Sequence, residues 1–119
     1  MVYIPTKQLT VEQFIAQYGD DLRYELADGE LVDMEPTGPH EAVSGKVAAR
    51  LILAIAQANH PWLIPRTCLI QPELSTATAR RPDVIVLDET ELSEEPLRQR
   101  QSIISSAKSI KLVEEVVRS

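Results

Sequence analysis

The stretch Arg80-Arg81-Pro82-Asp83-Val84-Ile85-Val86-Leu87-Asp88 decides the fold of this chain. Its run of Val, Ile and Leu closes on an acidic residue, which predicts a buried strand. Pro82 can stand only at the start of that strand, because proline has no amide hydrogen to donate to a sheet. Asp83 is therefore expected where a buried strand begins, and a carboxylate there is costly unless it is paired or coordinates a cation.

A second strand-like run, Ile110–Val117, carries the acid Glu115 among apolar neighbours. Two carboxylates on two buried strands suit a hard divalent cation such as Mg²⁺, which prefers oxygen ligands. A structural interpretation stays open as well. Asp83 could cap a turn or pair with Arg80 or Arg81, and Glu115 could lie on a solvated strand face.

Length and composition indicate one globular domain over residues 1–119. Hydrophobic residues make up 44% and charged residues 25% of the chain, both ordinary for a globular protein. The net charge of −6 argues against broad, non-specific phosphate binding but is compatible with a local basic groove. The single cysteine, Cys68, excludes an intramolecular disulfide, and no early apolar run is typical of a signal peptide or membrane span. We therefore expect a cytoplasmic protein.

The N-terminal part predicts a short helix followed by a β-hairpin. Thr10 and Gln13 match the capping-box pattern of a helix over 10–18, which Gly19 can end. Asp28-Gly29 between two alternating runs predicts a two-residue hairpin turn within 22–34.

Two acids share one face of this predicted hairpin. The alternation of strand side chains sets Glu25 and Glu30 together, opposite the face of Leu26 and Leu31. We expect the acidic face to be the solvated side of the hairpin, as is common for antiparallel sheets.

Apolar spacing predicts a long helix over 41–58 that packs on a sheet. The residues of its inner face recur every four positions, at Val43, Val47, Leu51 and Ile55. His40 precedes this helix, where a neutral imidazole is favoured and could donate or accept a proton; a capping role is the structural alternative. His60, just after the helix, is interpreted as a turn residue.

The remaining segments give weaker patterns. Residues 62–71 are predicted to form a strand that Pro65 interrupts, hence a bent or edge strand, with Cys68 as a small core residue. Residues 88–109 are acidic, then basic, then Ser-rich, and are predicted to form a mobile connection or a weak helix.

The order of these elements resembles the Uma family of restriction endonucleases, a branch of the PD-(D/E)xK nuclease superfamily that is expanded in cyanobacteria. The matching segments are TVEQF (10–14), RYELADGEL (23–31), PHE (39–41), RPDV (81–84) and LVEEVV (112–117), and they span nearly the whole chain. The resemblance implies an α/β (α+β) fold with a mixed sheet, built on a restriction endonuclease-like core of helix, three strands, helix and strand.

The resemblance also implies a site and a reaction. Carried over by position, Asp83 is the motif aspartate and Glu115 the motif glutamate, and the two hold Mg²⁺ or Mn²⁺. His40 and one of Glu30 or Glu25 are accessory residues near the site. The implied reaction is metal-assisted hydrolysis of a DNA phosphodiester, in which a lysine helps to orient or deprotonate the attacking water.

The sequence departs from the family pattern after Glu115. The lysine is expected two residues later, where Val117 stands, and the last helix and strand of the fold would lie beyond Ser119, so we expect a C-terminally incomplete domain. Strand alternation sets Lys111 on the same side as Glu115 and makes it the candidate substitute, with a surface lysine as the alternative. We therefore expect little or no DNA cleavage by the chain alone.

Two functional hypotheses follow. The first is a metal-dependent endonuclease. The second is a non-catalytic remnant or protein-interaction module that retains the nuclease fold. An incomplete sheet would expose an unpaired edge, which favours association with another chain, including a homodimer.

Overall fold

The structure is a computed structural model that describes residues 2–3, 8–93, 95 and 102–116. It confirms a mixed α/β fold with antiparallel and parallel strand pairs. The elements follow in the order β1 (Val2–Tyr3), α1 (Val11–Tyr18), β2 (Tyr24–Ala27), β3 (Glu30–Asp33), α2 (Gly38–Ala58), β4 (Trp62–Leu63), β5 (Leu69–Ile70), β6 (Val84–Asp88), α3 (Glu89–Leu92), β7 (Ile103–Ile104), the 3₁₀ turn η1 (Ala107–Ser109) and β8 (Ile110–Glu114). Among the described helices, none combines the length and the apolar character that a membrane span requires.

The N-terminal layer consists of α1 packed on a sheet of order β1-β3-β2. The predicted capping box is confirmed, since Thr10 and Gln13 each accept a hydrogen bond from the backbone amide of the other. The predicted hairpin turn is confirmed too, because Asp28 and Gly29 both have positive φ, as a tight two-residue turn requires. Phe14 of α1 is completely buried against this layer.

The second layer is the antiparallel sheet β4-β6-β8. All five residues of β6 are buried, as its run of Val, Ile and Leu predicts. The expectation that the strand before Glu115 is also buried is wrong: Leu112 is 41% and Val113 45% exposed. The reason is that β8 is an edge strand of this three-stranded sheet, so it has one neighbour instead of two.

A short parallel pair, β5 with β7, joins the two layers. Leu69 of β5 belongs to the core beneath α1, whereas Ile104 of β7 belongs to the core around β6. Cys68 is buried in this second core, which confirms its predicted packing role. Segment 62–71 is interrupted as Pro65 predicts, and its two halves join different sheets.

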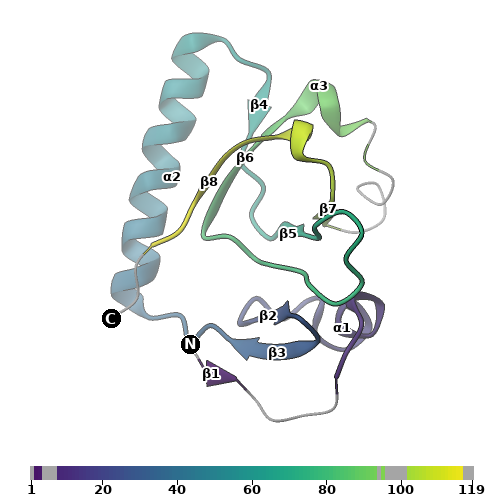
Figure 1. The fold of residues 1–119 in the computed structure, drawn as a ribbon. Helices are drawn as coiled ribbons and strands as arrows, with labels where there is room; N and C mark the ends of the chain where they lie inside the picture. Colours follow the sequence, from purple (N-terminus) through teal and green to yellow (C-terminus); the bar gives the residue numbers. More distant parts are fainter. Residues whose placement is uncertain (1, 4–7, 94, 96–101, 117–119) are drawn as a thin grey trace.

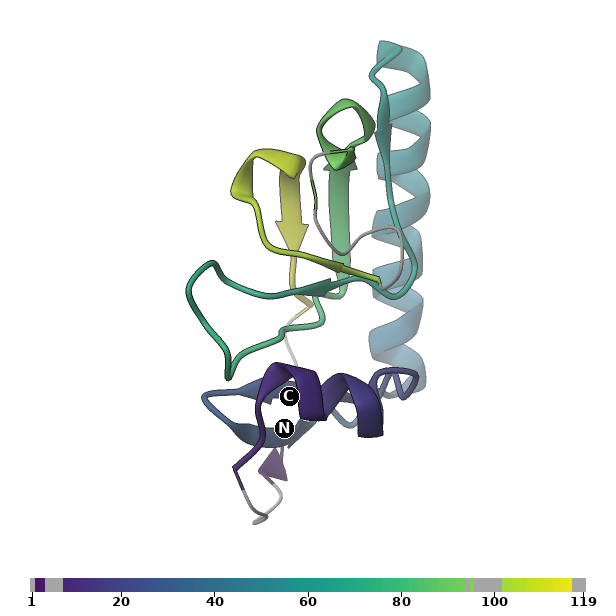
Figure 2. The same ribbon diagram turned by 90° about the vertical axis from the view of Figure 1, so that its right-hand side faces the viewer.

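The long helix α2 runs beside the second layer, from the hairpin at one end to β4 at the other (Figure 1). Its N-cap is Thr37, whose hydroxyl accepts from the His40 amide, and it ends at Asn59 in a left-handed conformation. The predicted packing is only partly right. Val43 is 48% exposed, Leu51 is half-buried, and no residue of α2 is fully buried. The molecule is only 19 Å thick in its shortest dimension, so α2 is covered from one side (Figure 2).

The connection after β6 is more structured than predicted. It contains α3, β7 and η1, while residues 94 and 96–101 lie outside the described part. The carboxylate of Glu95 is buried and accepts hydrogen bonds from the amides of Ser105 and Ser106 and from the hydroxyl of Ser109. Hydrogen bonds to the Glu95 carboxylate thus order the Ser-rich stretch. The composition of this stretch does not predict these bonds.

Candidate functional site

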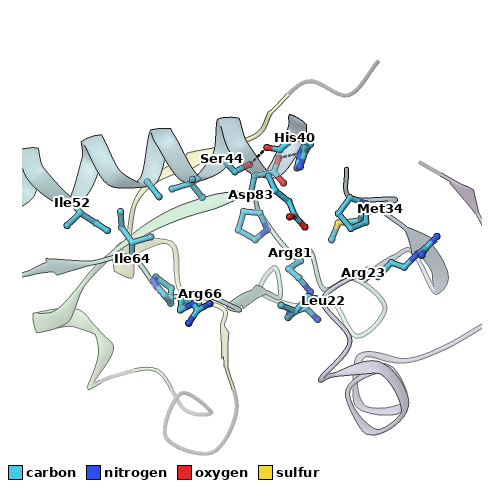
Figure 3. Close-up of a pocket in the computed structure, with 17 residues that line it drawn as sticks. Leu22, Arg23, Met34, His40, Ser44, Ile52, Ile64, Arg66, Arg81 and Asp83 are labelled. Carbon is cyan, nitrogen blue, oxygen red and sulfur yellow. Dashed lines mark hydrogen bonds and ion pairs between the residues drawn. The ribbon is translucent and has the colours of Figure 1, made fainter. Parts of the chain in front are cut away.

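A cleft of about 640 Å³ opens between α2 and the segments that follow β3 and β4 and precede β6. Figure 3 shows His40 and Ser44 of α2 near Asp83, with Leu22, Arg66 and Arg81 across the opening. The cleft has the size of a typical small-molecule site. Most of its other lining residues are apolar or small.

Asp83 and His40 form a close, nearly buried pair in this cleft. His40 Nε2 lies 3.2 Å from Asp83 Oδ2, and the side chains are only 10% and 7% exposed. Asp83 Oδ2 also accepts a hydrogen bond from the Val116 amide at 2.7 Å. The cap Thr37 and the bond from Ser44 Oγ to the His40 carbonyl fix the first turn of α2, which carries the imidazole.

The contact between this imidazole and the carboxylate is short but not aligned as a hydrogen bond. His40 Nε2 is buried and has no hydrogen-bond partner among the described residues. A buried side-chain nitrogen normally has a hydrogen-bond partner, so the lack of one at His40 Nε2 requires an explanation. Two ligands of one cation at bond lengths near 2.1 Å and right angles lie about 3.0 Å apart. The 3.2 Å separation therefore fits two donors to the same cation.

The possible metal ligands in the cleft suit a site in which the substrate supplies the remaining ligands. In the described part of the chain, no group of three or more His, Cys, Asp or Glu side chains could hold a metal ion. Mg²⁺ commonly binds one or two carboxylates and fills its other positions with water and substrate phosphate oxygens. Asp83 with a neighbouring donor therefore fits Mg²⁺ or Mn²⁺ as a partial shell.

Glu115 directly follows the strand that pairs with β6, and it does not line the cleft. β6 pairs with β8 so that Val84, the neighbour of Asp83, stands opposite Glu114, the neighbour of Glu115. The hydrogen bond from Val116 to Asp83 ties the two segments together just there. Glu115 itself is exposed and follows the end of β8, rather than lying within a buried strand as predicted.

The two hairpin acids have different surroundings. The expectation of a solvated face is wrong for Glu25, which is buried and accepts from Arg80 Nη1 at 2.9 Å and from the Arg81 amide at 3.0 Å. Glu30 is exposed at the turn end of β3 and does not line the cleft. Sequence spacing misses the arginine contacts, because they join residues more than 50 positions apart.

Arg81 is a cleft residue that sequence reasoning did not select. Its guanidinium donates to the carbonyls of Gly19, Tyr24 and Thr67, and burial lowers the pKa of Arg81 from its usual value. Arginine remains protonated in proteins, so the side chain supplies a fixed positive charge two positions before Asp83. The sequence feature that could have indicated Arg81 as a site residue is the pair of arginines directly before Pro82.

Lys111 does not lie near Asp83. Its Nζ is 3.6 Å from Asp88 Oδ2 and 5.9 Å from the centre of the Trp62 ring. Asp88 and Asp83 stand at opposite ends of β6, about 16 Å apart along the strand. The suggestion that Lys111 replaces the family lysine is therefore wrong, because side-chain alternation fixes the face of a strand but not the position along it.

The chain is similar to a known protein family. A family model, Uma2, described as "Putative restriction endonuclease", matches residues 11–119. No match was found among the curated proteins or among the solved structures.

Proposed function

We propose that this chain, which belongs to the Uma2 family, hydrolyses phosphodiester bonds of DNA with the help of a divalent cation. The family description indicates nuclease activity. The observation that carries the proposal is the 3.2 Å approach of His40 Nε2 to Asp83 Oδ2 inside the cleft, at a distance that suits two donors to one cation.

The roles of the residues follow from their chemistry. Asp83 and His40 supply two donors for Mg²⁺ or Mn²⁺, and Glu115, which does not line the cleft, would have to turn toward Asp83 to add a second carboxylate oxygen. When bound, such a cation polarises the scissile phosphate and makes water more acidic. Arg81 adds a fixed positive charge that favours the anionic phosphate in this partly dehydrated cleft. Glu30 has no role in this proposal, since it lies outside the cleft.

We propose a low cleavage rate for this polypeptide. The lining of the cleft includes no lysine among the described residues. A positioned group that assists proton transfer typically contributes about 10²–10⁴-fold to a rate. Among the described residues, the cleft thus has groups for binding the cation and phosphate but no lysine that could stand beside the attacking water.

Cleavage of supercoiled plasmid by the purified chain with Mn²⁺ tests this function. Slow nicking that requires the metal and disappears in Asp83→Asn is the expected result. The amide of Asn can still accept from the Val116 amide, so this variant keeps the local structure. Glu30→Ala is the matched control, because it removes an exposed carboxylate outside the cleft. Nicking that persists in Asp83→Asn would assign the activity to another site or to a contaminant.

A protein-interaction module that retains the nuclease fold is the second candidate. The exposed Leu112 and Val113 on the edge strand β8 favour it, since such an edge can pair with another strand and form a homodimer. This candidate predicts no nicking at any Mn²⁺ concentration, together with a dimer in sedimentation experiments that Val113→Lys dissociates.

A further inference from the structure

We propose that the cleft continues along α2 as a groove that binds single-stranded nucleic acid, with Arg66 on a phosphate and the His60–Trp62 pair on a base. The inference rests on the proposed function, since it places the strand beside the Asp83–His40 pair. It adds the form of the substrate and the path of the strand away from the reacting phosphate.

Two adjoining cavities define the groove. The cleft of about 640 Å³ and a second cavity of about 360 Å³ share Ile52 of α2 and Ile64 after β4. The first cavity reaches His40 at the start of α2, and the second reaches His60 just after its end. Eighteen helical residues, 41–58, lie between these two histidines, which corresponds to about 27 Å. The groove is therefore long enough for several nucleotides.

The charge of the groove segment differs from that of the whole chain. Residues 42–72 contain none of the eighteen acidic residues and three of the twelve cationic ones, in a chain of net charge −6. Of these three, Arg66 lines the cleft and lies opposite α2 (Figure 3). Lys46 and Arg50 are exposed and do not line either cavity. In the described part of the chain Arg66 has no hydrogen bond or ion pair, so its charge is available to a phosphate.

An aromatic pair stands at the far end of the groove. The rings of His60 and Trp62 are stacked, with centroids 4.1 Å apart and planes 10° from parallel. Lys111 Nζ lies 5.9 Å from the centre of the Trp62 ring and helps to hold it. His60 is exposed and lines the second cavity. A base can extend this stack, and such stacking tolerates any base because every base has a π-face.

The lining favours a single strand over a duplex. A duplex presents its phosphates outward and hides its base faces, so its affinity depends on many cationic contacts. This groove offers few cations but long apolar walls, including Ile52 and Ile64. Unstacked bases can cover such walls while one phosphate meets Arg66. Single-stranded sites commonly combine aromatic stacking with a cationic track in this way.

Fluorescence anisotropy of the full chain with a labelled oligonucleotide of about 12 nucleotides tests the groove. The titrations contain EDTA, which prevents metal-dependent hydrolysis, and are run at one fixed pH. We expect tighter binding of the single strand than of the matching duplex. Arg66→Ala and His60→Ala should each weaken binding about fivefold or more, while Arg50→Ala, with the same charge change on the exposed side of α2, should change it less than about twofold.

The dependence of the binding constant on salt concentration distinguishes the phosphate contact of Arg66 from the base contact of His60. Arg66→Ala should lower the slope of log K against log salt by about 0.7, because it removes one phosphate contact. His60→Ala should weaken binding without changing that slope. Equal losses of oligonucleotide affinity in Arg66→Ala and Arg50→Ala, or tighter binding of the duplex, would refute the proposed binding groove. Binding of an apolar dye that the oligonucleotide does not displace would assign the groove to a protein segment instead.

Failure of the groove and failure of the proposed function give different results. Metal-dependent plasmid nicking without single-strand binding would refute the groove and leave the nuclease in place. Strand binding without any nicking would refute the proposed function alone.

Discussion

Asp83 is held by groups from two other parts of the chain. The first turn of α2 brings His40, and the segment after β8 brings the Val116 amide, both onto the same carboxylate oxygen. Because β6 behind Asp83 is fully buried, the carboxylate is supported by a rigid strand rather than by a loop alone. A site on such supports keeps its geometry when a ligand binds.

A different aspartate, Asp33, makes stability depend on pH. Arg23 Nε donates to Asp33 Oδ1 at 2.6 Å, and this hydrogen bond is the main reason why the pKa of Asp33 is lowered. Asp88 has a lowered pKa as well, mainly because of the Thr90 hydroxyl. A carboxylate whose pKa is lower in the folded state stabilises the fold above its unfolded pKa of about 3.9, and this stabilisation is lost as pH falls through the folded pKa.

We therefore expect the contribution of these two aspartates to the unfolding temperature to be constant from about pH 8 to pH 5 and to fall below about pH 4. Thermal unfolding followed by circular dichroism at a series of pH values measures this. Asp33→Asn should make the unfolding temperature decrease less steeply at acidic pH, because it removes one of the two carboxylates whose pKa is lowered. A variant curve as steep as that of the original chain would show that Asp33 does not contribute.

Residue-level prediction succeeded where the reason was local. A carboxylate at the start of a buried strand had to find a partner, and Asp83 accepts a hydrogen bond from the Val116 amide beside the His40 imidazole. The environment of Glu25 was not predictable, because its burial depends on Arg80, which the bridge between Leu26 and Ala79 brings beside β2. Glu30, directly after the Asp28-Gly29 turn, is also a glutamate but is exposed.

At the scale of elements, α2 was predictable in extent but not in packing. Its apolar period and its terminal residues indicate where a helix forms, and the structure begins it only three residues earlier than predicted. The apolar period of α2 does not indicate how much sheet surface is available to cover the helix. The sheet beside α2 is three strands wide, and the cleft occupies part of the space between them.

This difference has a measurable consequence for stability. Leu31 is buried in the core beneath α1, so Leu31→Ala should lower the free energy of unfolding by about 2–5 kcal/mol. Leu51 is half-buried on α2, and Leu51→Ala should cost only about 1 kcal/mol. Urea denaturation of both variants measures the two values. Equal losses would mean that α2 belongs to the main core after all.

The strand β8 shows the same limit of sequence patterns. Its apolar residues predicted burial, yet Leu112 and Val113 are exposed because the strand lies at a sheet edge. The number of neighbours of a strand follows from the topology of the whole sheet, not from the strand itself. The connection before β8 was misjudged for a similar reason, since one buried acid, Glu95, orders it.

At the scale of the whole molecule, two small cores meet around the β5–β7 pair. One core lies beneath α1 and the other around β6, and the cleft opens beside the first turn of α2. This arrangement brings His40, Asp83 and Val116 together, although they are far apart in the sequence. The order of elements resembles a nuclease family, and the family match agrees. The geometry of the cleft required the structure.

Calorimetric titration of Mn²⁺ into the chain tests the central claim, that Asp83 is the anchor of a divalent-cation site. We expect saturable heat for the original chain and for Glu30→Ala, weaker binding for His40→Ala, and no binding for Asp83→Asn at an unchanged urea midpoint. Undiminished heat in Asp83→Asn, or its loss in Glu30→Ala, would show that Asp83 does not anchor a cation site.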